Sequence, residues 1–367
     1  MNNYDYIDNP ADLEALIEKI NKEPWVAIDT EFLRTSHYFS KLCLIQIGTE
    51  DWRVCVDPLI CPNLADLFEA LNHGPLLVFH SGRQDLEIFL QYSGELPKRI
   101  FDTQLAAILL KQGMNVGYAR MVKHMLGLEL DKSQVRTDWS RRPLSDAQIH
   151  YAVDDVRYLA QIYPMMLNEL SESDLALLDA DFSVLQEPET YQTEYAQLWQ
   201  KIPQSNRLQG HQRCALQQLT IWREMHAMNA NTQRRHWLND EALFDLAVEQ
   251  PRTFAQLYEI STLPSKIARE HGDEILDTLK QAQQIDKDDW PQFDINPPMP
   301  AKDQSIADRL VPFIKQQAQE YNIPYQQLTS KRDIARLVHA PDACKLLTGW
   351  RQKVIGEPLC EALKQLD

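Results

Sequence analysis

The sequence has no uninterrupted apolar stretch near the roughly 18 residues that a membrane-spanning helix needs. Its first residues, Met1-Asn2-Asn3-Tyr4-Asp5, lack the basic start and apolar core of a secretory signal peptide. Only six cysteines are present, and no two of them form a CxxC pair. We therefore expect a cytoplasmic protein with reduced, mostly buried thiols and no membrane partner.

Motifs of several common enzyme and binding classes are also absent. No stretch resembles a zinc finger, a phosphate-binding P-loop or a Ser/His/Asp triad. The histidines lack metal-ligand spacing, which favours structural roles for them. The composition itself is ordinary for a globular protein: 367 residues, of which 44% are hydrophobic and 25% charged, enough for two or three domains.

Positive charge is scarce, because 37 Lys and Arg residues face 53 Asp and Glu residues, for a net charge of −16. Taken alone, this argues against a nucleic-acid-binding protein, since phosphate contacts require Lys and Arg. However, half of the excess lies between Tyr158 and Lys201, where eight acidic residues occur without a Lys or Arg. Residues 300–367 hold ten basic and eight acidic residues, or about +2. The overall acidity therefore leaves room for a basic path elsewhere.

Residues 1–165 alternate between strand and helix patterns, which predicts an α/β domain with a mixed sheet. The strands at 42–47 and 52–56 are close enough in sequence to form a hairpin. Short apolar runs predict strands at 25–28, 42–47, 52–56, 76–79 and 100–101. Helical spacing of apolar residues predicts helices at 12–20, 64–71, 85–92, 103–111, 117–126 and 145–163.

Strand patterns end near residue 165, and the remaining sequence is typical of helices. Amphipathic spacing predicts helices at 212–228, 242–248 and 266–282, and more between 303 and 367. Four prolines between residues 291 and 300 are too many for a helix interior and indicate a linker. We therefore expect a domain at 1–165, an acidic helical connection at 166–206, an all-α domain at 207–288, a linker at 289–301 and a second all-α domain at 302–367.

Acidic residues follow the first of these predicted strands. Asp29 and Glu31 come after the strand at 25–28, and residues i and i+2 of a strand point to the same face. Two such carboxylates repel each other unless a cation lies between them, and hard oxygen ligands suit Mg²⁺ or Mn²⁺. For an isolated pair, a solvated turn at the end of the strand is the alternative interpretation.

Two further acidic motifs occur later in the α/β region. Asp85 lies at the start of the helix at 85–92, and Tyr151 and Asp155 share one face of the helix at 145–163. Taken singly, Asp85 could be a helix cap and Asp155 an exposed acid of an amphipathic helix. Together the three motifs supply four carboxylates and one phenol in a fixed order along the chain.

In the order and spacing of these motifs, the sequence resembles the DEDD superfamily of 3′–5′ exonucleases, in its tyrosine-bearing branch. Within that superfamily it looks most like the ribonuclease D family, through Leu44-Ile45-Gln46, Asp102-Thr103-Gln104 and Arg136-Thr137-Asp138-Trp139. Residues 219–227 resemble the helicase-and-RNase-D C-terminal (HRDC) domain, although the proline usual in that domain is not found near Asn231.

The resemblance implies an α/β RNase H-like exonuclease domain with a mixed sheet, followed by two small all-α HRDC-like domains. It implies a hydrolase, a metal-dependent 3′–5′ exoribonuclease that releases 5′-mononucleotides from tRNA precursors and other small structured RNAs. No obligatory protein partner is implied. By the same resemblance, Tyr151 would orient the attacking water, and two divalent ions, Mg²⁺ or Mn²⁺, would be held by Asp29, Glu31, Asp85 and Asp155.

Further side chains are candidate contacts to the substrate. The candidates for the terminal nucleotides are Phe32, Gln46 and His80. Gln46 could equally form a hydrogen bond within the sheet. The candidates for phosphate contacts are Lys132, Arg136 and Arg142. Ion pairs with neighbouring aspartates are the alternative for these three cations.

Two other functions remain open at the level of sequence. A DNA 3′–5′ exonuclease would use the same carboxylates, since a contact to the RNA 2′-hydroxyl can come from the backbone or from many side chains. A non-catalytic nucleic-acid-binding scaffold is the second alternative. An intact set of four acids argues against it, because a scaffold has no reason to keep them beside phosphate.

Overall fold

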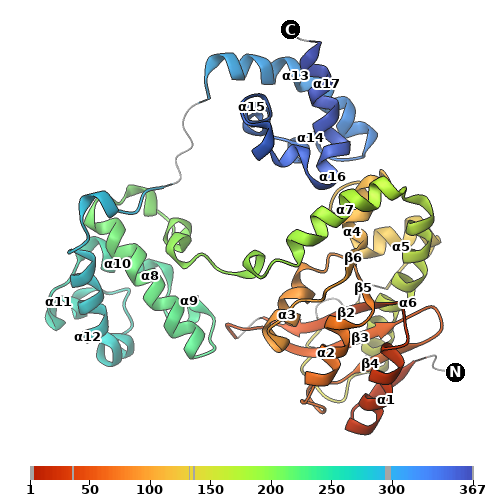
Figure 1. Cartoon of the computed structure of the whole chain (residues 1–367). Helices are drawn as coiled ribbons and strands as arrows, with labels where there is room; N and C mark the ends of the chain where they lie inside the picture. The colour runs from red at the N-terminus through yellow and green to blue at the C-terminus, as the bar shows by residue number, and fades with distance from the viewer. Residues whose placement is uncertain (1–3, 35–36, 132, 135–136, 294–298, 366–367) are drawn as a thin grey trace. The chain divides into compact units, whose positions relative to one another are not determined.

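The sheet has six strands in the order β1-β4-β3-β2-β5-β6. Figure 1 labels strands β2 to β6. This computed structural model describes residues 4–34, 37–131, 133–134, 137–293 and 299–365. The β3–β4 pair is an antiparallel hairpin, whereas β1–β4, β2–β5 and β5–β6 are parallel, so the predicted mixed sheet is confirmed. The strands are β1 Asp5–Ile7, β2 Trp25–Leu33, β3 Lys41–Gly48, β4 Arg53–Val56, β5 Leu76–Phe79 and β6 Ile100–Asp102.

Two strands differ from the prediction. Strand β2 continues to Leu33, so Asp29 and Glu31 lie within the strand and not in a turn after it. The edge strand β1 was not predicted, because three residues are too few to show an alternating pattern. Its position is fixed by parallel pairing with β4, in which Tyr6 is opposite Cys55.

The helices of the α/β region begin at recognisable caps. The side chain of Asn9 accepts the amide of Asp12 to start α1, and Ser145 and Gln148 form a capping box at the start of α6. Helix α6 passes through Pro164 and ends at Glu169, beyond its predicted end. The helices are α1 Pro10–Ile20, α2 Ala65–His73, α3 Arg83–Ser93, α4 Thr103–Leu109, α5 Tyr118–Leu126, α6 Asp146–Glu169 and α7 Glu172–Leu185.

The described chain separates into two compact units, which we describe one at a time. The sheet unit contains Met1–Phe32, Leu42–Tyr191 and Pro298–Asp367, and the helical unit contains Leu33–Lys41 and Gln192–Pro297. The helical unit has its own apolar core, built around Trp199, Leu219 and Leu246. Its main helices are α8 His211–Asn229, α9 Arg234–Trp237, α10 Asp240–Glu249, α11 Phe254–Glu259 and α12 Ser265–Ala282.

The segment between β2 and β3 packs within the helical unit. The Tyr38 hydroxyl donates to Glu224 at 3.2 Å, and Asn231 accepts the amide of Phe39 at 3.0 Å. Arg234 pairs with Glu224 at 3.3 Å and also lies over the Tyr38 ring. The helical unit therefore includes described residues between β2 and β3 that are distant from it in sequence.

The C-terminal helices belong to the sheet unit. The amide of Trp350 donates to Asp181 of α7 at 2.7 Å, and Lys353 forms an ion pair with Asp174 of α7. Buried residues of these helices, such as Leu337 of α15, lie in the same apolar cluster as the sheet. The helices are α13 Ala301–Glu320, α14 Tyr325–Leu328, α15 Lys331–His339, α16 Gly349–Arg351 and α17 Glu357–Lys364, with a π-helical turn at Gln352–Gly356.

The predicted fold class, a mixed α/β sheet domain with helices after it, is confirmed. The predicted domain boundaries stay a prediction, because the two compact units group the chain differently from a simple linear division. Within the described residues, no helix is both long enough and apolar enough to cross a membrane.

Candidate active site

Three of the four predicted carboxylates come from two elements that face each other, β2 and α6. Trp25, Asp29 and Glu31 share a face of β2. This face is covered by α6, because Trp25 meets Tyr163 of α6 edge-on at 4.9 Å between ring centres. Four residues onward along the strand and eight residues back along the helix both cover about 12–13 Å. Asp29 lies four residues after Trp25 on β2, and Asp155 lies eight residues before Tyr163 on α6. The two acids are therefore at about the same distance from the aromatic pair, on facing elements.

Three of the carboxylates form a compact cluster. Asp29, Glu31 and Asp155 each offer an oxygen, and these atoms lie within 4.8 Å of one another. Tyr151 lies one turn before Asp155 on α6, and its ring is 6.1 Å from that of Trp139. The motif pattern in the sequence therefore corresponds to a real spatial cluster.

The fourth carboxylate, Asp85, is held from the other face of β2. The backbone amide of Thr30 donates to Asp85 Oδ1 at 3.1 Å, and the Thr30 hydroxyl donates to the same oxygen at 2.5 Å. Asp85 lies in the first turn of α3 and is only 7% exposed. Thr30 therefore fixes one oxygen of Asp85 and leaves Oδ2 for another partner.

The turn before α3 depends on Asp102. Its side chain accepts the amides of Ser81 and Gly82 at 3.0 and 2.9 Å, and the amide of Gln104 at 2.8 Å at the start of α4. A Cβ atom at Gly82 would lie 2.5 Å from Cβ of Phe79, so this close approach requires glycine. Asp102 thus ties the starts of α3 and α4 together and positions Asp85.

All four carboxylates and Tyr151 line one cavity of about 340 Å³. Phe32 and His80, two predicted nucleotide contacts, line it as well. His80 Nδ1 lies 3.0 Å from the Thr103 hydroxyl, and burial lowers the pKa of the His80 ring. The imidazole is therefore neutral near pH 7. The other lining residues are Thr30, Ser81, Gln84, Tyr118 and Leu159.

Removal from water raises the pKa of every carboxyl group in the cluster. Burial, followed by the charges of Asp85 and Asp155, raises the pKa of Asp29 well above its usual range. Burial and the charges of Asp29 and Asp85 raise the pKa of Glu31 to about 9. Burial raises the pKa of Asp85 to about 7, and burial with the charge of Glu31 raises that of Asp155. Such a cluster stays fully ionised only beside cations, so its oxygen donors suit divalent metal ions.

The hydroxyl of Tyr151 keeps its proton at neutral pH. Burial raises the pKa of Tyr151 well above its ordinary value, and the charges of Asp155 and Glu31 raise it further. A protonated phenol donates a hydrogen bond but does not remove a proton from water. This agrees with an orienting role for the hydroxyl.

Some predicted substrate contacts lie elsewhere. Gln46 is fully buried in the middle of β3, does not line the cavity and has no side-chain hydrogen bond to the described residues. Arg142 binds Asp57 through two nitrogens and donates to the carbonyl of Cys43 at 2.6 Å, so it ties the sheet together instead of lining the cavity. The predicted contact of Arg142 with phosphate stays a prediction, because the structure shows only its bonds within the protein. Lys132 and Arg136 lie outside the described residues.

Tyr118 is a site residue that sequence reasoning missed. It lines the cavity, and its hydroxyl donates to the backbone carbonyls of Asp154 and Asp155, at 2.9 and 2.5 Å. These bonds hold α6 where it presents Asp155. The available signal was weak, because Tyr118 simply begins an amphipathic helix.

A second group of metal-ligand side chains lies in the helical unit. Glu274 of α12 accepts hydrogen bonds from Trp222 at 2.9 Å and lies 2.7 Å from His226 and 3.2 Å from His271. The ring of His226 also stacks on Trp237. These contacts join α8 to α12, and hydrogen bonds already use the same ligand atoms.

Comparison with known proteins decides the family. Residues 4–171 match the 3′–5′ exonuclease family, and residues 212–279 match the HRDC domain family. The chain is 34% identical to ribonuclease D of Zymomonas mobilis over 96% of this chain and 92% of that protein. The chain belongs to the ribonuclease D family.

Other ribonucleases D agree with this assignment. The chain is 29% identical to ribonuclease D of Pseudomonas paraeruginosa over 98% of this chain and 97% of that one. It superposes on Escherichia coli RNase D, described as an exoribonuclease involved in structured RNA processing, with a TM-score of 0.80, 30% identity and 99% coverage of both chains. The predicted enzyme class, a hydrolase of the 3′–5′ exoribonuclease type, is confirmed at the level of the family.

Proposed function

We propose that this ribonuclease D uses Asp29, Glu31, Asp85 and Asp155 to hold two divalent ions, Mg²⁺ or Mn²⁺, while it removes nucleotides from the 3′ end of RNA. The observation that carries the proposal is the single cavity that brings these carboxylates together with Tyr151. Three of the four acids already place oxygens within 4.8 Å of one another. The high pKa values of the four acids support a site built for cations.

The side chains of the cavity have distinct proposed tasks. When bound, the ions would lower the pKa of water and stabilise the charge that develops on the phosphate and on the leaving oxygen. Tyr151 donates a hydrogen bond that orients the attacking water. Phe32 offers an apolar ring to the terminal base, and the neutral His80 offers a hydrogen-bonding nitrogen. The water oxygen bonds to phosphorus and loses a proton to solvent. The P–O3′ bond breaks, the O3′ oxygen of the shortened RNA takes up a proton, and a 5′-mononucleotide leaves.

We propose tRNA precursors and other small structured RNAs as the physiological substrates, in the cytoplasm and without an obligatory protein partner. The name of the E. coli relative, which refers to structured RNA, supports the RNA class. We also propose the division of the chain into residues 1–165, 166–206, 207–288, 289–301 and 302–367. The HRDC match at 212–279 falls inside the third of these segments and supports it. Lys132, Arg136 and Arg142 remain proposed phosphate contacts.

The test uses single-stranded RNA and DNA of the same sequence, each labelled at the 5′ end. With Mg²⁺ or Mn²⁺, RNA should shorten one nucleotide at a time from its 3′ end and release 5′-mononucleotides. EDTA should stop the reaction, and the Asp155→Asn protein serves as the inactive control. A tRNA precursor with a 3′ trailer should be trimmed under the same conditions.

The alternatives give different results. Faster removal of DNA than of RNA would support a DNA exonuclease. Binding of RNA without any metal-dependent shortening would support a non-catalytic scaffold. Internal cuts, or shortening that continues in EDTA, would contradict the two-ion proposal.

A further inference from the structure

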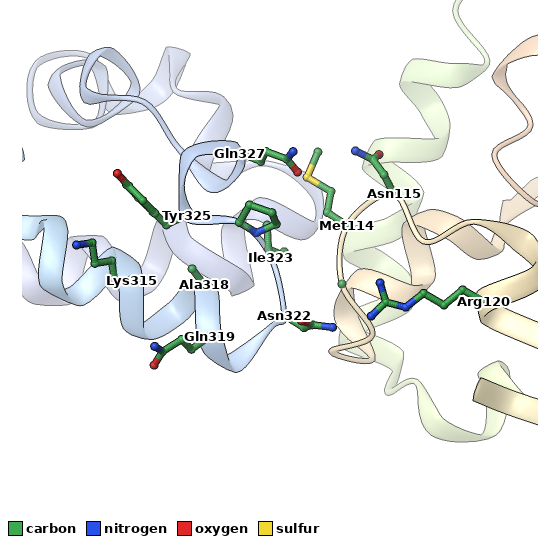
Figure 2. Close-up of a pocket in the computed structure, with 12 residues that line it drawn as sticks. Met114, Asn115, Arg120, Lys315, Ala318, Gln319, Asn322, Ile323, Tyr325 and Gln327 are labelled. Carbon is green, nitrogen blue, oxygen red and sulfur yellow. The ribbon is translucent and has the colours of Figure 1, made fainter. Parts of the chain in front are cut away.

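A second, larger cavity opens between two parts of the sheet unit. Its volume is about 760 Å³, and Figure 2 shows the α5-side wall facing the wall from α13 and α14. We call it the α5–α13 groove. It is lined by Gly113, Met114, Asn115, Arg120, Lys315, Ala318, Gln319, Asn322, Ile323, Pro324, Tyr325 and Gln327.

The charge of the groove is opposite to that of the whole chain. Two cations, Arg120 and Lys315, line it, and no Asp or Glu is among its lining residues, although the chain carries a net charge of −16. A cavity of about 940 Å³ in the helical unit has the opposite charge. Three acids, Asp245, Glu249 and Glu259, line it, together with a single arginine. The α5–α13 groove therefore suits an anionic ligand.

The groove also offers a ring and several amides. Tyr325 is 39% exposed, and the Lys315 ammonium lies 5.5 Å from the centre of its ring. The side-chain amides of Gln319 and Gln327 lie on the same wall, and Asn115 lies on the facing wall. A cation, an aromatic face and uncharged hydrogen-bonding groups match the phosphates and bases of a single nucleic-acid strand.

The two walls of the groove are held together by specific contacts. Lys111 pairs with Glu320 at 2.6 Å, and the Asn322 amide donates to the carbonyl of Gln112 at 3.4 Å. Gly113 has φ +107°, and a Cβ atom there would lie 2.8 Å from the carbonyl oxygen of Asn322. Only glycine accommodates both this backbone conformation and this approach. The groove is thus a built feature of the unit.

A third cavity has lining residues in common with both the groove and the carboxylate cavity. This cavity, of about 310 Å³, shares Arg120 with the groove and shares Tyr118, Tyr151 and Asp155 with the carboxylate cavity. Asp131 also lines this third cavity, so its charge is mixed. A strand whose 3′ nucleotide lies beside Asp155 would pass Arg120, the residue common to this cavity and the groove, before it reaches Lys315 and Tyr325.

We propose that the α5–α13 groove binds the single-stranded RNA that precedes the 3′ end, with phosphates at Arg120 and Lys315 and a base stacked on Tyr325. This inference rests on the proposed function, because it takes the reacting 3′ end to be in the carboxylate cavity. The rival occupant is a protein segment, for which Met114, Ala318 and Ile323 would supply the apolar floor.

The test measures kcat/KM for a series of oligoribonucleotides, from a trinucleotide to a strand of about 12 nucleotides. The variants are Lys315→Ala, Tyr325→Ala and the conservative Lys315→Arg. Lys302→Ala is the matched control, since Lys302 is an exposed lysine of the same helix α13 that does not line the groove. Thermal melts establish that each variant is folded.

We expect the ratio of kcat/KM between the longest and the shortest oligonucleotide to fall at least about fivefold in Tyr325→Ala, since a stacked base contributes binding of that order. Lys315→Ala should lower the same ratio, and Lys315→Arg should restore most of it. The association constant K of the protein for the longest oligonucleotide should also be measured at several salt concentrations. For Lys315→Ala, the slope of log K against the logarithm of the salt concentration should become less steep by about 0.7, the value for one phosphate contact on a single strand. Lys302→Ala should keep the wild-type ratio.

Failure of this inference is distinct from failure of the proposed function. An unchanged length ratio in folded Lys315→Ala and Tyr325→Ala proteins, with RNA still shortened from its 3′ end, would overturn the groove proposal alone. The same would follow if both variants changed the trinucleotide and the long strand by equal factors. Absence of metal-dependent shortening in the wild-type protein would instead overturn the function on which the proposal rests.

Discussion

At the scale of single residues, the carboxylate cavity contains acids that need cations to stay ionised and a phenol, Tyr151, that keeps its proton. The acids of β2 and α6 have raised pKa values because water is largely removed and their charges lie close together. Tyr151 keeps its hydroxyl proton for the same two reasons. The cavity therefore needs cations to keep its acids ionised, while its phenol remains a hydrogen-bond donor.

Replacement of Tyr151 by Phe tests the orienting role. The change keeps the ring against Trp139 and removes only the hydroxyl. If the hydroxyl orients water, kcat should fall by about 10²–10⁴-fold, the range for positioned proton-handling groups. Titration with Mn²⁺ should give nearly the wild-type affinity, because the carboxylates are unchanged. Wild-type kinetics in the variant would reduce Tyr151 to a packing residue.

Asp29→Asn and Asp155→Asn should abolish activity without unfolding the protein. Each substitution removes one negative charge from a cluster whose members repel one another, so stability in EDTA should stay level or rise. The measurements are thermal melting in EDTA and hydrolysis of labelled RNA in Mg²⁺. Glu50→Gln, a change on the exposed turn between β3 and β4, is the control and should leave both readings unchanged. Near-normal turnover in either aspartate variant would remove that residue from the catalytic set.

At the scale of elements, side-chain hydrogen bonds between neighbouring segments fix how the helices and strands pack. Asp102 joins the starts of α3 and α4, Tyr118 joins α5 to α6, and Arg142 joins the chain before α6 to Asp57 after β4. In the helical unit, Glu274 joins α12 to Trp222 and His226 of α8. Each of these side chains links two segments of the chain through its hydrogen bonds.

Glu274→Gln should weaken the joint between α8 and α12. The hydrogen bonds from Trp222, His271 and His226 lower the pKa of Glu274 to about 2, from an ordinary value of 4.5. A depressed folded-state pKa adds stability that is complete above about pH 4.5 and is lost as the pH falls towards 2. Because the side chain is 50% exposed, we expect at most about 1 kcal/mol, or a few degrees in melting temperature.

The measurement for Glu274 is thermal melting of the whole chain from about pH 7 down to pH 3. The difference between the wild-type and Glu274→Gln proteins should shrink as the pH falls. Glu270→Gln on the same helix is the matched control, since Glu270 pairs only weakly, at 3.5 Å, with exposed Arg269. A difference that grows on acidification would contradict the assigned role of Glu274.

At the scale of the whole molecule, the C-terminal helices share their core with the sheet and do not form a detachable appendage. Leu346 and Trp350 lie in the same apolar cluster as Leu178 and Phe182 of α7. The amide of Trp350 also donates to Asp181 of α7. The part of the chain that carries the carboxylates therefore depends on residues at the far end of the sequence.

A chain that ends after Tyr191 should therefore be markedly less stable than the full chain. Truncation uncovers apolar surface on α7, and a loss of only about 2 kcal/mol would lower the melting temperature by about 4–8 °C. The measurements are thermal melting and binding of an apolar dye. Addition of a separate polypeptide spanning residues 299–365 should restore part of the stability. A truncated protein with the melting temperature of the full chain would show that the C-terminal helices contribute nothing to this core.

Much of the fold and of the carboxylate site is determined locally by the sequence. The period-2 pattern of β2 places Asp29 and Glu31 on one face, and the spacing of Tyr151 and Asp155 places both on one face of α6. The strand at 76–79 and most helices were predicted to within a few residues, because apolar periodicity is a property of the segment itself. Residue spacing also carried the family resemblance that the comparisons confirm.

Tertiary structure alone decided which surfaces meet. Periodicity says which face of an element is buried but not what covers it, so Thr30 as the partner of Asp85 and Asp57 as the partner of Arg142 could not be predicted. The α5–α13 groove joins Arg120 to Lys315, almost 200 positions later in the sequence. No local sequence pattern predicts that these two residues line the same groove, because their proximity depends on the free energy of packing distant segments against one core.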